Sequence, residues 1–290
     1  TAGIYASRAS LEPVLFEALE TCGQLMLTTD VENYPGFDSG VMGPDLMQIF
    51  KKQAERFGTQ IKTETVNKIE KIDGGFKLES GKGSYEFKSV IISSGASAIW
   101  LDVKGEKELQ GHGVSSCATC DGFFFKEKKV IVVGGGDSAM EEALFLTKFA
   151  TKVYIVHRRD SFRASKIMQD RVLENEKIEV LWNKEVTEIH GKESVNSVSL
   201  KDTGDQSLLE LAIDGVFVAI GHTPNVAFLD GLVDLDEKGY IKTGFTTDTS
   251  TSIPGIFAAG DVADSVYRQA VTAAGTGCQA AIDAERWLEH

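Results

Sequence analysis

The feature that most constrains this 290-residue chain is a glycine pattern placed between a buried strand and a helix. The apolar run Val130–Val133 is typical of a strand inside a parallel sheet, and a helical pattern covers residues 140–149. In the Gly-x-Gly-x-x-Ala loop between them, the first glycine permits a tight turn and the second lets backbone approach a pyrophosphate. The phosphates of such a ligand lie at the helix N-terminus. The pattern therefore predicts a dinucleotide site with contacts from Gly134, Gly136, Asp137, Ser138 and Ala139.

The end of the next strand indicates which dinucleotide this site takes. An NAD site usually places an acidic residue there to bind the ribose 2′-hydroxyl, but Val153–Val156 is followed by basic residues. Guanidinium groups match the geometry of a 2′-phosphate, so we expect NADPH. The alternative is a solvated basic loop without a ligand. The predicted contacts are His157, Arg158, Arg159 and Arg163.

Length and charge limit the classes of protein that remain. At roughly 150 residues per domain, the chain is long enough for two domains. Its 43 acidic residues against 30 basic ones give a net charge of −13, which argues against nucleic acids and anionic membranes as partners. No apolar run approaches the length of a membrane span, and no signal peptide is visible. We therefore expect a globular α/β protein.

The chain contains four cysteines, at positions 22, 117, 120 and 278. A secreted disulfide framework would be much denser, which favours a reducing compartment, and we expect the cytoplasm. Structural zinc needs a second pair of ligands that neither the isolated cysteines nor the histidines provide, so we expect no metal. The Cys117-Ala118-Thr119-Cys120 sequence is best explained as a redox pair.

The residues around this pair favour redox chemistry over a structural role. Two intervening residues allow Cys117 and Cys120 to form a disulfide across one helical turn, and a helix start stabilises a thiolate. Asp121 follows directly and could carry a proton to or from a leaving thiolate. The alternatives are two buried core cysteines and an Asp121 that only caps the following helix.

NADPH delivers two electrons as a hydride, and a disulfide accepts two electrons. The direct reaction is poor, so a flavin is expected between them. A second nucleotide site should therefore exist, and its candidates are Gly260-Asp261 after an apolar strand and Arg268-Gln269-Ala270 at the start of the last helix.

At this point the sequence resembles the low-molecular-weight thioredoxin reductases, along essentially its whole length. The stretches that carry the resemblance are CATCDGFF at 117–124, GGGDSA at 134–139, HRRDSFRA at 157–164, AIGHTPN at 219–225, AGDV at 259–262 and YRQA at 267–270. The resemblance implies two Rossmann-like, three-layer domains, with an NADPH domain (98–222) inserted into an FAD domain (1–97 and 223–290). It also implies a homodimer that reduces thioredoxin.

The same resemblance implies roles for individual residues. Cys120 faces the flavin, Cys117 attacks the disulfide of thioredoxin, and the domains rotate about hinges near 95–101 and 221–225. FAD contacts are expected from Gln24, Asn33, Val66 through its backbone, Gly95, Gly260, Asp261, Arg268, Gln269 and Ala270.

The sequence departs from the family pattern in three places. The family's first strand and its glycine-rich FAD loop would precede Thr1, Cys22 stands where glycine is usual, and Ser94 replaces threonine. Two alternative functions follow: a related flavin-dependent reductase with another acceptor, and a redox-sensing scaffold whose flavin site is disabled.

Overall fold

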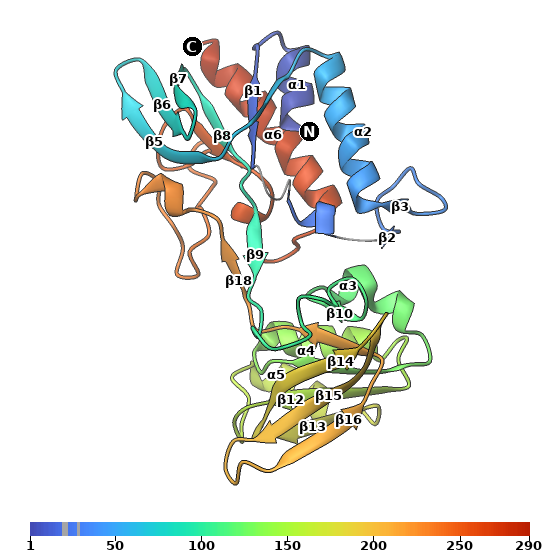
Figure 1. The fold of residues 1–290 in the computed structure, drawn as a ribbon. Helices are drawn as coiled ribbons and strands as arrows, with labels where there is room; N and C mark the ends of the chain where they lie inside the picture. The colour runs from blue at the N-terminus through green and yellow to red at the C-terminus, as the bar shows by residue number, and fades with distance from the viewer. Residues whose placement is uncertain (19–22, 28–29) are drawn as a thin grey trace. The chain divides into compact units, whose positions relative to one another are not determined.

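The computed structural model describes residues 1–18, 23–27 and 30–290. Within it the chain divides into two compact units. The first unit comprises Thr1–Ser97 and Thr223–His290, and the second comprises Ala98–His222 (Figure 1). The chain passes between the units in β9 (Ala96–Ala98) and β18 (His222–Pro224), which pair with each other.

The second unit is built on a parallel sheet of five strands in the order β10-β17-β11-β12-β13. The strands are β10 (Val114–Ser115), β11 (Lys129–Val133), β12 (Lys152–His157), β13 (Ile178–Trp182) and β17 (Gly215–Val218). The helices of this unit are α3 (Ala118–Asp121), the 3-10 helix η2 (Gly122–Phe125), α4 (Asp137–Leu146) and α5 (Lys166–Leu173). An antiparallel sheet adds β14 (Lys184–Gly191), β15 (Val195–Asp202) and β16 (Leu208–Ala212).

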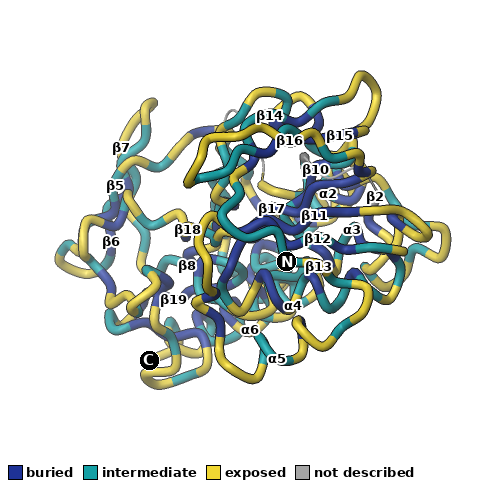
Figure 2. Tube along the Cα trace, turned by 90° about the horizontal axis from the view of Figure 1, so that it is seen from below, coloured by how far each residue is buried: buried dark blue, intermediate teal, exposed yellow. Residues whose placement is uncertain are grey.

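Alternation along the central strand explains why this unit has three layers. Side chains of a strand point to opposite faces in turn. Val130 and Val132 accordingly belong to a core cluster with the α4 residue Met140, whereas Ile131 belongs to a cluster with Val198 of β15. Both faces of β11 are therefore covered, and Figure 2 shows β11 and β17 buried along most of their length.

The first unit contains two parallel strand pairs, β1 with β4 and β8 with β19. Its strands are β1 (Val14–Glu17), β2 (Asp30–Val31), β3 (Val41–Met42), β4 (Gln60–Thr63), β5 (Val66–Ile72), β6 (Gly75–Ser80), β7 (Gly83–Phe87), β8 (Val90–Ile92) and β19 (Ile256–Ala258). Its helices are α1 (Ala2–Arg8), η1 (Gln24–Leu27), α2 (Gly43–Arg56), η3 (Ala227–Leu229), η4 (Gly260–Val262) and α6 (Ala270–Leu288). The antiparallel sheet β5-β6-β7 shares a core with β8, β19 and η3.

The observed elements confirm the expected α/β fold and correct two helix boundaries. The helix expected over 140–149 begins at Asp137 and ends at Leu146. The last helix, expected to start with Arg268-Gln269-Ala270, begins at Ala270, because Gln269 caps it and Arg268 has a φ of 47° that a right-handed helix does not accommodate. None of the helices in the described ranges is both long and apolar enough to cross a membrane.

Candidate active site

The two cysteines of the CxxC sequence form a disulfide at the start of α3. Their Cα atoms are 5.3 Å apart. The amide of Cys117 donates to Ser115 Oγ at 3.0 Å, and the amides of Cys120 and Asp121 donate to the Cys117 carbonyl at 3.2 and 3.1 Å. Both cysteines are half-buried. The alternative of two separate core cysteines therefore does not describe this structure, since the sulfur atoms are bonded and partly accessible.

Asp121 ends α3, and burial raises the pKa of its carboxyl above the ordinary value. A hydrogen bond from Ser115 opposes this shift without reversing it. The side chain makes no capping hydrogen bond to η2, the helix that follows. The alternative that Asp121 only caps η2 therefore lacks the capping hydrogen bond that it needs. A carboxyl with a raised pKa, in contrast, keeps a proton available at higher pH, as an acid–base group requires.

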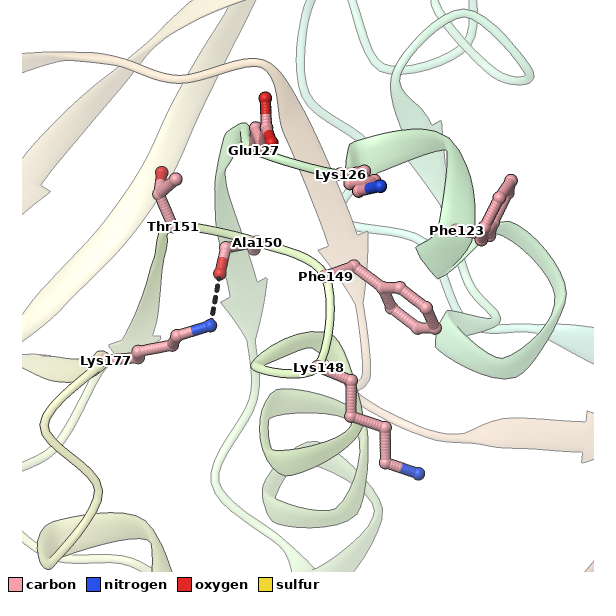
Figure 3. Close-up of a pocket in the computed structure, with 8 residues that line it drawn as sticks. All are labelled: Phe123, Lys126, Glu127, Lys148, Phe149, Ala150, Thr151 and Lys177. Carbon is pink, nitrogen blue, oxygen red and sulfur yellow. Dashed lines mark hydrogen bonds between the residues drawn. The ribbon is translucent and has the colours of Figure 1, made fainter.

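Exposed aromatic residues directly after Asp121 are a feature that the sequence analysis missed. Phe125 is buried, but Phe123 is 56 % exposed and its ring packs edge-to-face on Phe149, with centroids 5.9 Å apart. Phe123 also borders a depression of about 590 Å³ with Lys126, Glu127, Lys148, Phe149, Ala150, Thr151 and Lys177 (Figure 3). Three consecutive phenylalanines cannot all face one core, so the sequence already indicated that at least one of these rings is exposed.

The glycine loop has the shape that a dinucleotide needs. A Cβ atom at Gly134 would lie 2.5 Å from the Ala219 carbonyl oxygen and 2.8 Å from Ala139 Cβ, so neither position tolerates a larger residue. A Cβ atom at Gly136 would have no atom within 4 Å, so the space at the start of α4 is open. The backbone N–H groups at the start of α4 and the open space in front of them fit a bound pyrophosphate.

The three arginines near this loop are exposed and free for an anion. Arg158, Arg159 and Arg163 take part in none of the ion pairs found in the described part of the chain. The backbone amide of Arg163 donates to the Gly135 carbonyl at 2.8 Å, which holds the arginine loop beside the glycine loop. This arrangement fits a dinucleotide that carries an additional phosphate.

His157 occupies a different position from the arginines. It is 6 % exposed, and a Cβ atom at Gly135 would lie 2.2 Å from its ring. Its Nε2 donates to the Ser161 carbonyl at 3.0 Å. Burial lowers the pKa of the imidazole, the hydrogen bond to Ser161 opposes this shift, and repulsion from the three nearby arginines adds to it. The ring therefore packs beneath the glycine loop and supports it, and its lowered pKa favours the neutral form.

The residues proposed for the flavin lie in the first unit, several of them near the start of α6. Asn33 Nδ2 donates to Gln269 Oε1 at 3.3 Å, although these residues are 236 positions apart. Gln24 Nε2 donates to the Ala96 carbonyl at 3.5 Å, and the Gly95 carbonyl accepts from the amide of Asn225 at 2.9 Å. The other predicted residues are Gly260 in η4, Arg268 and Ala270 at the start of α6, and Val66 at the start of β5.

Asp261 in η4 has the most perturbed carboxyl group of this region. Burial and the neighbouring Asp264 raise its pKa to about 6, against an opposing effect of Arg268. No hydrogen-bond donor contacts this carboxyl among the described residues. A half-buried acceptor without a donor fits a ligand hydroxyl. Cys22, which stands where the family usually has glycine, lies outside the described residues.

Replacing Asp261 by asparagine is expected to stabilise the flavin-free protein above pH 6. The folded pKa of about 6 exceeds the ordinary value of 3.8, so the folded state retains a proton that the unfolded chain loses. The free energy of unfolding therefore falls as pH rises between these values, by at most about 3 kcal/mol. Denaturant unfolding at pH 4 and pH 8 measures the difference. The exposed Glu237→Gln should follow the wild-type curve, and equal pH dependence in Asp261→Asn and wild type would contradict the assignment.

Comparisons with known proteins show the family of this chain. A family model described as pyridine nucleotide-disulphide oxidoreductase matches residues 1–277. A thioredoxin reductase of Mycolicibacterium smegmatis is 53 % identical, over 99 % of this chain and 92 % of that protein. Thioredoxin reductase 2 of Arabidopsis thaliana is also 53 % identical, over 100 % of this chain and 79 % of that protein.

Solved structures give the same result for the fold. A thioredoxin reductase from Giardia duodenalis superposes with a TM-score of 0.94 at 45 % identity, covering 100 % of this chain and 94 % of that one. One from Streptococcus pyogenes gives 0.93 at 40 % identity, covering 99 % and 94 %. The chain therefore belongs to the pyridine nucleotide-disulphide oxidoreductase family and, within it, to the low-molecular-weight thioredoxin reductases.

Proposed function

We propose that the protein is a thioredoxin-disulfide reductase that passes electrons from NADPH through FAD and the Cys117–Cys120 disulfide to oxidised thioredoxin. The observation that carries this proposal is the partly accessible disulfide followed directly by a half-buried carboxyl of raised pKa. The same unit holds a dinucleotide loop with unpaired arginines. The exposed Phe123, three residues after Cys120 in the sequence, offers apolar surface to a protein substrate.

The chain's own residues divide the work at two nucleotide sites. At the first, Gly134, Gly136, Asp137, Ser138 and Ala139 would hold the pyrophosphate of NADPH, with the 2′-phosphate on Arg158, Arg159 and Arg163. At the second, FAD would be held by Gln24, Asn33, Val66, Gly95, Gly260, Asp261, Arg268, Gln269 and Ala270. When bound, the flavin accepts a hydride from NADPH and supplies two electrons to the disulfide.

The reduced cysteine pair completes the reaction by two thiol–disulfide exchanges. Cys117 thiolate attacks one sulfur of the thioredoxin disulfide, which breaks that bond and forms a mixed disulfide. Cys120 thiolate then attacks Cys117 Sγ, which re-forms the Cys117–Cys120 disulfide and releases the second thioredoxin thiol. Two electrons pass to thioredoxin, and the two protons from the cysteine thiols end on its thiols. Asp121 carries protons between these sulfur atoms and water.

We also propose a homodimer in a reducing compartment, the cytoplasm. Tyr5, Met42 and Ile49 expose large parts of apolar side chains on the first unit, which supports a subunit contact there. Cys278 has a free thiol, as expected where disulfides are not maintained. Light scattering coupled to size exclusion measures the oligomeric state.

Anaerobic titration with NADPH, followed by addition of oxidised thioredoxin, tests the function. Flavin absorbance should bleach and then recover in proportion to the thioredoxin added. Recovery with a small disulfide but not with thioredoxin would favour a reductase with another acceptor. A protein that binds no flavin would favour the redox-sensing scaffold.

Replacing Arg158 and Arg159 together by alanine is expected to weaken NADPH far more than NADH. A hydrogen bond to a charged group contributes about 1.5–3 kcal/mol, which is about tenfold to a hundredfold in affinity. The KM for each nucleotide measures this difference. Arg171→Ala, at an exposed arginine on α5 of the same unit, is the control. Equal effects on both nucleotides would contradict the 2′-phosphate assignment.

A further inference from the structure

The glycine loop (134–137) and the arginine loop (158–165) of the second unit are tied together by four hydrogen bonds. Two join backbone atoms: the amides of Arg163 and Ala164 donate to the Gly135 carbonyl at 2.8 and 3.2 Å. The other two end on one carboxylate oxygen: the amide and the hydroxyl of Ser165 donate to Asp137 Oδ1 at 2.9 and 2.7 Å. We call the Asp137–Ser165 contact the loop clamp.

The Ser165 side of the clamp is unusual for a helix start. Ser165 is the N-cap residue of α5, a position where a serine hydroxyl normally accepts from an amide of its own helix. Ser165 makes no such capping bond. Its hydroxyl instead donates to Asp137, 28 residues earlier in the chain. The hydroxyl therefore serves the connection between the loops, and α5 begins without that cap.

The Asp137 side is equally informative. Asp137 is the first residue of α4, where the helix dipole favours a bound phosphate. A carboxylate free to turn at that position would repel the phosphate. Two donors from Ser165 hold one of its oxygens toward the arginine loop. The clamp therefore fixes the direction of a negative charge beside the predicted pyrophosphate.

Arg163 is the arginine whose position depends most directly on this contact. Arg158 and Arg159 follow β12 directly, whereas Arg163 lies at the other end of the loop, two residues before Ser165. Its guanidinium joins no ion pair in the ranges that the structure covers, and its backbone amide is held by the Gly135 carbonyl. Positioning a side chain before binding reduces the entropy lost when a ligand binds.

We propose that Ser165 and Asp137 are positioning residues that set the preference for a 2′-phosphorylated dinucleotide by holding Arg163 at the glycine loop. This proposal rests on the NADPH assignment above. It adds two residues that do not themselves contact the 2′-phosphate, one of which, Ser165, lies outside the Gly-x-Gly-x-x-Ala and arginine patterns.

Ser165→Ala removes the hydroxyl bond and leaves the amide bond in place. Calorimetric titration of the purified protein with NADP⁺ and NAD⁺ should show about tenfold weaker NADP⁺ binding and less than twofold change for NAD⁺. Ser165→Thr retains a hydroxyl and should restore NADP⁺ affinity. Ser161→Ala is the matched control, because the Ser161 hydroxyl donates to Asp160 within the same loop and does not reach the glycine loop.

A double-mutant cycle separates positioning from a general loss of structure. In the Arg163→Ala background, Ser165→Ala should weaken NADP⁺ binding by less than twofold, because the arginine that it positions is gone. An undiminished effect in that background, or equal weakening of NADP⁺ and NAD⁺, would overturn the loop clamp. Wild-type protein that binds both nucleotides equally would overturn the NADPH assignment together with the clamp. A Ser165→Ala protein that keeps the wild-type preference overturns the clamp alone.

Discussion

Replacing Cys117 by serine is expected to abolish thioredoxin reduction while leaving flavin reduction by NADPH at the wild-type rate. The serine hydroxyl is far less nucleophilic than a thiolate and cannot form the mixed disulfide with thioredoxin. Hydride transfer precedes the thiol steps and does not use this side chain. Stopped-flow absorbance of the flavin and steady-state thioredoxin turnover, measured on one preparation, report the two steps separately.

Two further variants make this result specific to the disulfide. Cys120→Ser should also abolish turnover, because the mixed disulfide on Cys117 could not be resolved. Cys278→Ser is the matched control, because Cys278 is a free cysteine of α6 and should retain activity. Turnover near the wild-type rate in either variant of the pair would show that electrons reach thioredoxin by another route.

Asp121→Asn is expected to slow the thiol steps by on the order of 10²–10⁴-fold, the usual contribution of general acid–base catalysis. Asparagine is close in shape but carries no transferable proton. The flavin-reduction phase should be normal and only the phase that follows thioredoxin addition should slow. Unchanged turnover would return Asp121 to a structural role, although the structure shows no capping bond from its side chain.

The pH dependence gives a second test of the same carboxyl. Burial raises the pKa of Asp121, so its protonated form persists to higher pH than in an exposed aspartate. The step that needs the acid should therefore slow as pH rises through that raised pKa. Ser115 lowers the pKa through its hydrogen bond, so Ser115→Ala should move the profile to higher pH. A profile that is identical in both proteins would contradict this assignment.

The sequence alone predicted the features that depend on short stretches of chain. The apolar run of β11, the glycine pattern after it and the helical spacing of α4 each reflect local steric and hydrophobic rules, and all three elements are present. Pairing of Cys117 with Cys120 was also predictable, because two intervening residues bring the sulfur atoms together in one turn. The ends of helices were less predictable, since caps such as Gln269 depend on side-chain geometry.

Only the tertiary structure decided what surrounds each functional group. Asp121, which follows the cysteine pair, and Asp261, in η4, are ordinary acidic residues in the sequence. Burial by other segments raises the pKa of both carboxyl groups. His157 belongs to a basic cluster in the sequence, yet the fold places it beneath the glycine loop as a buried ring with a lowered pKa. The hydrogen bond from Ser165 to Asp137 depends on the fold, which brings the arginine loop against the glycine loop. Burial and long-range contacts depend on how distant segments pack, and periodicity along the chain does not contain that information.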